Sequence, residues 1–201
     1  MKARNITLAA GLIIALAAGA AGAYAYYSAK TDTVTNTYNI VAGGGASGET
    51  VGKVEESFDP ETAKNLEPRG TFTKDVKVSS NLDYSSHVYL LVTVPMMNSR
   101  LKDETEKKLR DSVSLNFDTS SWTLVKSTAG TASAPSKYLY RYSTVLPAKS
   151  KTKSLFTKVT VPDYVEADGI KGSIDVTGYM ISAVNVATDD ADKDASSKFF
   201  T

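Results

Sequence analysis

The chain has 201 residues, of which 42% are hydrophobic and 22% are charged, as expected for one soluble globular domain with a real core. Its formal net charge of +1 gives no basic field to hold phosphates, so nucleic acid is not expected as a partner. It contains no cysteine, which excludes disulfides, thiolate metal sites and cysteine nucleophiles.

The first 25 residues have the features of a secretory signal peptide. Two basic residues near the start precede residues 6–25, which carry no charge. The small side chains of Ala23 and Ala25 fit recognition by a signal peptidase, so we expect cleavage before Tyr26. The alternative is an uncleaved anchor, since this apolar stretch could just span a bilayer. We favour cleavage. The protein is then expected to contact a membrane only through its leader, before the leader is removed.

The mature chain is predicted to begin with a strand that is separate from the main domain. Within residues 26–40, Val34, Tyr38 and Ile40 fall on one face and threonine and asparagine side chains fall on the other, which is strand periodicity. A flexible hinge is predicted next, at the glycines Gly43, Gly44 and Gly45.

The body of the chain, residues 49–187, contains short strand patterns separated by turn signals. The strongest is residues 87–95, which is apolar on both faces and therefore expected at the centre of a sheet. The others are residues 51–58, 71–80, 113–117, 122–126, 138–142, 155–161 and 174–186. Short strands at regular spacing favour an antiparallel β-sandwich over a parallel α/β fold.

Two segments are expected to depart from this strand pattern. Glu104 and Lys108 lie four residues apart within residues 96–111, which predicts a short surface helix inserted in the sandwich. The C-terminal residues are small and charged and are predicted to form a disordered tail. The expected organisation is therefore a signal peptide at 1–25, an N-terminal strand and hinge at 26–48, a β-sandwich at 49–187 and a disordered tail at 188–201.

No pattern of catalytic or metal-binding residues stands out. His87 is the only histidine, whereas a zinc protease of the H-E-x-x-H kind needs two on one helix face. We therefore expect His87 to be an ordinary turn or sheet-edge residue, and we predict no enzyme activity, metal or cofactor. A calcium site is the weaker reading of the acidic cluster Asp189, Asp190, Asp192 and Asp194, because the EF-hand pattern is absent.

The tyrosines Tyr138, Tyr140 and Tyr142 alternate along one predicted strand. Aromatic residues at this spacing are more often core than a platform for a carbohydrate or a partner, so we expect them in the core.

Four segments of the chain carry motifs whose order and spacing resemble those of a known family. In order they are AYAYYSAKTDTVTNTYNIVAG, EPRGTFTKDVKVSSNLDYSSHVYLLVTVP, SSWTLV with KYLYRYSTVLPAKSKTKSLFTKVTVP, and IDVTGYMISAVN. Together they resemble the TasA/camelysin-type family of exported surface proteins, whose leaders are processed by a dedicated signal peptidase of the SipW type. The resemblance covers residues 5–187 and implies a jelly-roll-like β-sandwich at the cell surface. It also implies fibre or biofilm-matrix formation, as in some members, or surface metalloprotease activity, as described for camelysins.

The sequence departs from the family pattern at two places. Tyr27-Ser28-Ala29 stands where Phe-x-Asp is common after the leader, and the turn Leu146-Pro147-Ala148-Lys149 lacks the usual glycine. These departures concern the processing enzyme more than the fold.

The separate N-terminal strand favours a secreted structural subunit that assembles by donor-strand exchange. A strand from one subunit would complete a sheet of the next through main-chain hydrogen bonds. A head-to-tail contact of this kind does not close, so it propagates into a fibre, and the partners are copies of the chain and the signal peptidase. The alternatives are a strand that folds back into its own domain, a monomeric surface binding module or adhesin, and a camelysin-like protease.

Overall fold

The computed structural model describes residues 13–15, 26–28, 52–58, 68–168 and 174–200. The first two stretches are short strands, β1 (Ile13–Ala15) and β2 (Tyr26–Ser28), which pair antiparallel with each other.

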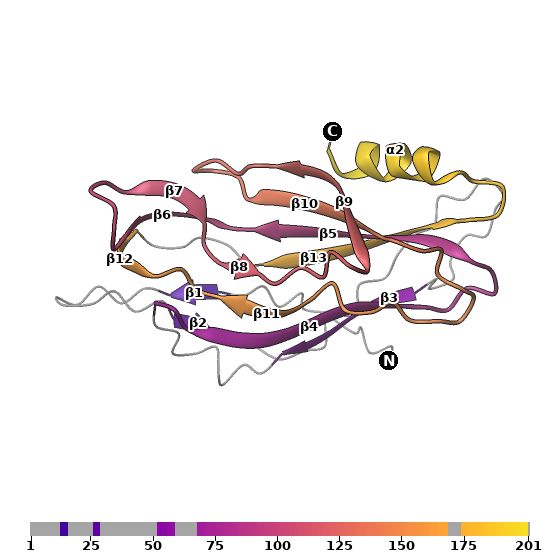
Figure 1. The fold of residues 1–201 in the computed structure, drawn as a ribbon, viewed down its shortest axis with the longest axis horizontal. Helices are drawn as coiled ribbons and strands as arrows, with labels where there is room; N and C mark the ends of the chain where they lie inside the picture. The colour runs from indigo at the N-terminus through magenta and orange to yellow at the C-terminus, as the bar shows by residue number, and fades with distance from the viewer. Residues whose placement is uncertain (1–12, 16–25, 29–51, 59–67, 169–173, 201) are drawn as a thin grey trace, which may run out of the picture.

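Two four-stranded antiparallel sheets pack face to face, which confirms the predicted all-β sandwich (Figure 1). We name each sheet after its longest internal strand. In order across the β5 sheet lie β13 (Asp175–Ser182), β5 (Ser86–Val94), β10 (Ser136–Tyr142) and β9 (Trp122–Thr128). In order across the β4 sheet lie β3 (Gly52–Phe58), β4 (Thr71–Ser80), β11 (Phe156–Thr160) and β8 (Ser114–Leu115).

The main core lies between the two sheets and follows from the alternation of side chains along each strand. On β5, Val88, Leu90 and Val92 point into this core, while Tyr89 and Leu91 lie on the opposite face in a second, smaller apolar cluster. Strand β5 is therefore buried on both faces, as its continuous apolar sequence predicts for a central strand.

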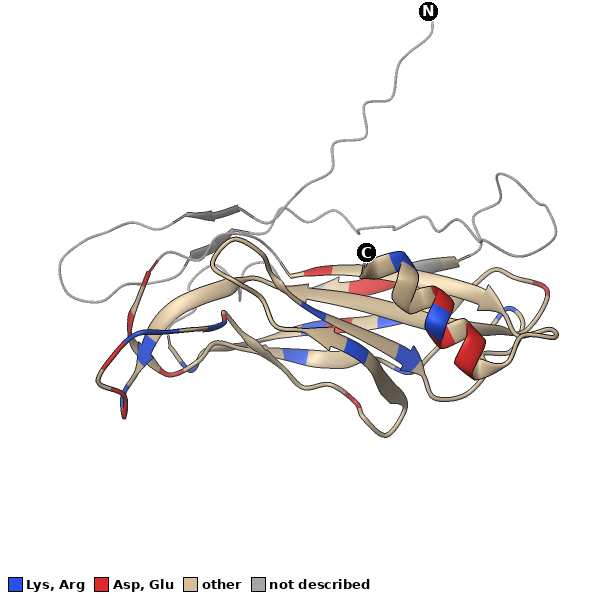
Figure 2. Cartoon of the chain, turned by 90° about the horizontal axis from the view of Figure 1, so that it is seen from above, with Lys and Arg blue, Asp and Glu red and all other residues tan. Residues whose placement is uncertain are grey.

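The C-terminal residues form a helix, α2 (Thr188–Phe199), so the predicted disordered tail is wrong. The helix lies along the outer face of the β5 sheet (Figure 1), where Ala191 and Ala195 are buried in the second cluster. Small side chains four residues apart let the helix approach the sheet closely. Acidic residues in its first turn and Lys198 in its last turn complement the helix dipole (Figure 2).

No helix in the described part of the chain combines the length and the apolar character needed to cross a membrane.

A third, three-stranded sheet stands where a helical insertion was predicted, so that prediction is wrong. Glu104 and Lys108 do form an ion pair of 3.1 Å, but they do so across the turn of a hairpin. Glu104 also accepts the backbone N–H of Leu101 at 2.9 Å, and this bond, with those from Lys108 and Arg110, lowers the pKa of Glu104 to about 2. The strands are, in order across the sheet, β12 (Tyr164–Ala167), β6 (Met96–Leu101) and β7 (Lys108–Asp111).

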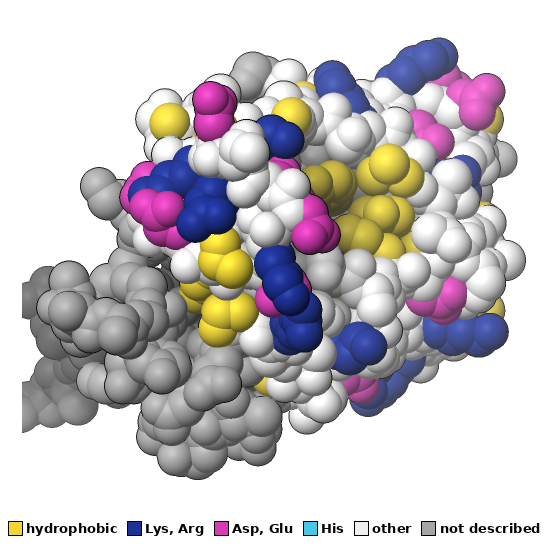
Figure 3. All heavy atoms as spheres, turned by 60° about the vertical axis from the view of Figure 1, so that its left-hand side comes forward, with side chains coloured by type: hydrophobic (Ala, Val, Ile, Leu, Met, Phe, Trp, Pro, Cys, Tyr) yellow, Lys and Arg dark blue, Asp and Glu magenta, His cyan; other side chains and the backbone are white. Residues whose placement is uncertain are grey.

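This third sheet joins the ends of the other two. Strand β6 continues β5 beyond Pro95, and β12 follows β11 beyond Pro162. The two continuations pair antiparallel, with Leu101 opposite Tyr164. Basic and acidic side chains are interspersed on this end of the molecule (Figure 3). They include the ion pairs Lys107–Glu166, Lys107–Asp168 and Arg100–Glu166.

Candidate functional site

His87 lies near the start of β5, the second strand of its sheet, and is paired with Ile181 of β13, whereas a turn or a sheet edge was predicted. It is the second residue of β5, which has β13 on one side and β10 on the other, and it is only 4% exposed. Its Nε2 donates to the backbone oxygen of Val186 at 3.1 Å and so ties the segment after β13 to β5. No cluster of three or more potential metal ligands occurs among the described residues.

The alternating tyrosines of β10 belong to the core, as predicted. Tyr140 is buried, and Tyr138 and Tyr142 are half-buried against the same cluster. The ring of Tyr140 lies 4.6 Å from that of Phe117, and the ring of Tyr142 lies 5.1 Å from that of Trp122.

The acidic residues of α2 attach the helix to the sheet. Asp192 accepts a hydrogen bond from the hydroxyl of Tyr89 at 2.7 Å, and Asp194 accepts one from Tyr179 at the same distance. Asp192 also forms an ion pair of 2.9 Å with Arg141. Burial, together with these carboxylates, raises the pKa of both tyrosines, so their hydroxyls stay protonated as donors. These contacts hold the helix in a fixed position.

Strand β9 forms one edge of the β5 sheet. It pairs with β10 on one side, and no strand in the described ranges pairs with its other side. Ser143 donates its N–H to the oxygen of Ser121 at 2.9 Å, which marks a hydrogen-bonded pair. Because hydrogen-bonded and non-hydrogen-bonded pairs alternate along an antiparallel ladder, the N–H and C=O of Leu124, three pairs further on, point away from β10. We call this row of outward backbone groups the β9 edge.

The β9 edge has an apolar side that faces the β4 sheet. Leu124 lies opposite Tyr140, whose side chain is in the main core, so Leu124 shares the inner face of the sheet. It is nevertheless 46% exposed. The β4 sheet ends on this side in β8, which has only two residues and leaves this face uncovered. Leu124, with the half-buried rings of Phe117 and Tyr138, forms what we call the inner seam.

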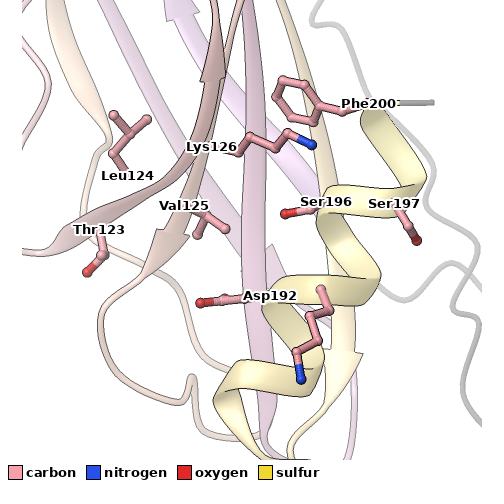
Figure 4. Close-up of a pocket in the computed structure, with 9 residues that line it drawn as sticks. Thr123, Leu124, Val125, Lys126, Asp192, Ser196, Ser197 and Phe200 are labelled. Carbon is pink, nitrogen blue, oxygen red and sulfur yellow. The ribbon is translucent and has the colours of Figure 1, made fainter.

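On its outer face, β9 forms a groove with α2, which we call the α2 groove. The ladder is irregular between Leu139 and Tyr140 of β10, which leaves Val125 as an extra residue in β9 and places Lys126 on the outer face. The amine of Lys126 lies 4.8 Å from the centre of the Phe200 ring (Figure 4). The groove has a volume of about 610 Å³, and its lining includes Thr123, Val125, Lys126, Asp192, Lys193, Ser196, Ser197 and Phe200.

The other predicted site residues lie outside the described ranges. These are Ala23 and Ala25 at the cleavage site, Val34, Tyr38 and Ile40 of the predicted donor strand, and the hinge glycines. Tyr26, the expected first residue of the mature chain, begins β2.

Comparison with known proteins found no matching family, no matching curated protein and no matching solved structure.

Proposed function

We propose that the chain is a secreted structural subunit that assembles head to tail into extracellular filaments by strand addition. The β9 edge is the observation that carries this proposal. Natural sandwiches protect their edges with prolines, charged side chains such as lysine, bulges, very short strands or a covering loop. Strand β9 carries Lys126 and one bulge, but it is seven residues long, contains no proline and presents the exposed Leu124 beside its outward backbone groups. An edge of this kind favours pairing with another strand.

The sequence supplies a strand suited to this pairing. Residues 26–40 read as a strand that precedes a run of glycines, and residues 1–25 read as a leader that would bring the chain outside the cell. The resemblance to exported, fibre-forming surface proteins supports the same proposal.

Electron microscopy of the secreted protein tests the proposal. The full chain, exported through its own leader, should begin at Tyr26 by N-terminal sequencing and should form filaments. A matched variant with residues 26–41 replaced by a glycine–serine linker of equal length should remain monomeric. Monomers from the intact chain would favour the adhesin alternative, and filaments from both proteins would exclude assembly through this strand.

His87 should be dispensable for assembly. The variant His87→Ala leaves the carbonyl of Val186 without its donor, so the free energy of unfolding should fall by about 1–3 kcal/mol. Filament yield below the melting temperature should be unchanged, and a metal chelator should not alter the yield of the wild type. A folded variant without filaments would show that His87 takes part in assembly, and proteolysis that a chelator abolishes would instead support a camelysin-like site.

A further inference from the structure

We propose that the β9 edge accepts residues 34–40 of a second copy of this chain, with the apolar face of that strand on the inner seam and its polar face in the α2 groove. This inference rests on the proposed function, and it adds the position on the subunit at which the incoming strand binds.

The backbone of β9 is the best available match for that strand. Strand β9 has seven residues, and so does the segment from Val34 to Ile40. Among the described strands, the other edges are less suitable. Strand β8 has two residues, and β7 and β12 have four each. The edges β13 and β3 are at least as long as β9, but apolar residues on them such as Val176 and Val54 are buried in the main core, whereas Leu124 is 46% exposed.

The side chains match as well as the backbone. A strand added beside β9 places alternate residues on the two faces of the sheet. In one of the two possible orientations of its faces, the strand places Val34, Tyr38 and Ile40 on the inner seam, with Asn36 between Val34 and Tyr38. Thr35, Thr37 and Asn39 then face the α2 groove, whose lining includes Ser196 and Ser197. A shift by one residue would turn Val34, Tyr38 and Ile40 away from the inner seam, so contact with the seam selects one alternation.

The wall of the groove is already formed before a strand binds. Asp192 and Asp194 fix α2 to Tyr89 and Tyr179, and the amine of Lys137 donates to the backbone oxygen of Phe199 at 3.1 Å. A preformed acceptor lowers the entropy cost of binding, because the incoming strand alone must become ordered.

Removal of the outward N–H of Leu124 tests the backbone part of the proposal. The variant Leu124→Pro removes the outward N–H and places a ring where the incoming strand would lie, while the ladder to β10 keeps its hydrogen bonds. Filament yield should fall to the level of the variant that lacks the N-terminal strand. The matched control Leu124→Ala keeps the N–H and should retain part of the yield. Wild-type yield from a folded Leu124→Pro protein would overturn the proposal.

Engineered disulfides test the location independently of that variant. Because the chain has no cysteine, any pair introduced is the only one present. Lys126→Cys, on the outer face of β9, is combined in turn with Thr35→Cys, Thr37→Cys and Asn39→Cys. One combination should give a ladder of covalent oligomers after oxidation, because facing residues on paired strands lie within disulfide reach. The same three donors with Thr177→Cys, on the β13 edge, serve as the matched control and should give none.

Each other outcome counts against a defined part of the proposal. A disulfide within single chains would show that the strand folds back onto its own β9 edge. Normal filaments without any cross-link to position 126, or a ladder with position 177 alone, would overturn β9 as the acceptor and leave the proposed function standing. Filaments that persist after replacement of residues 26–41 would overturn the proposed function itself.

Discussion

Replacement of both Val34 and Ile40 by aspartate should abolish filament formation and leave the melting temperature of the monomer unchanged. Each apolar side chain buried in a neighbouring subunit contributes about 1.5–3 kcal/mol. A carboxylate in the same place would lose its hydration without gaining a partner, which adds a further penalty. Filament yield by microscopy, compared with thermal melting of the monomer, measures both effects.

The polar face of the same strand provides the control. The pair Thr35→Asp and Thr37→Asp adds the same charge on the side that would face the α2 groove, where Lys126 and Lys193 are near, and should reduce filament yield far less. A synthetic peptide of residues 26–41 should slow growth of wild-type filaments by occupying the free end. Normal filaments from the Val34/Ile40 variant would exclude donor-strand exchange. Loss of monomer folding together with filaments would show that the strand belongs to its own domain.

Trp122→Ala should be among the most destabilising single substitutions in the sandwich. Trp122 is 1% exposed, and its Nε1 donates to the backbone oxygen of Lys153 at 3.3 Å. Its ring packs against Tyr142 at 5.1 Å. Truncation would leave a large cavity and an unpaired carbonyl, and the free energy of unfolding should fall by about 3–5 kcal/mol. Urea denaturation measures this loss.

The control for this prediction lies two residues along the same strand. Leu124 shares the inner face with Trp122 but is 46% exposed, so Leu124→Ala should cost about 1 kcal/mol or less. Equal losses from the two variants would mean that Leu124 is covered in the monomer. In that case the inner seam is closed and the β9 edge is less accessible than the structure indicates.

Most of the strands could be predicted because residues close together in the sequence, namely alternating side chains and turn residues, define them. Strands β4, β5 and β9 fall where alternation and turn residues place them. The helix predicted within residues 96–111 is wrong because the same pairing of Glu104 with Lys108 fits across a hairpin turn. Strand β12 was not predicted because it has only four residues and because its strand conformation depends on pairing with β6, which lies far away in the sequence.

Helix α2 depends on contacts that sequence periodicity does not contain. Its fully buried residues are two alanines, and Phe199 on the same face is half-buried against Tyr179, which is too thin an apolar stripe to predict a packed helix. The partners that hold it, Tyr89 and Tyr179, come from two other strands. Tertiary packing therefore stabilises a segment whose composition alone is typical of disorder.

The β9 edge could not be found from the sequence because strand order is not chain order. The pattern around Trp122 predicts a strand but does not show which side of it has no neighbour. Leu124 reads as an ordinary core position, and its exposure results from the short length of β8 on the facing sheet.

The pairing of β5 with β13 also determines when the protein can fold. The central strand of its sheet receives one neighbour, β10, from the middle of the chain and the other from residues close to the C-terminus. The β4 sheet likewise needs β11, about 80 residues after β4. During synthesis neither sheet can be completed until most of the chain has been made, and pairings between distant segments form slowly. The sandwich can therefore close only once β13 has been made, so a nascent chain lacks its complete core until close to the end of synthesis.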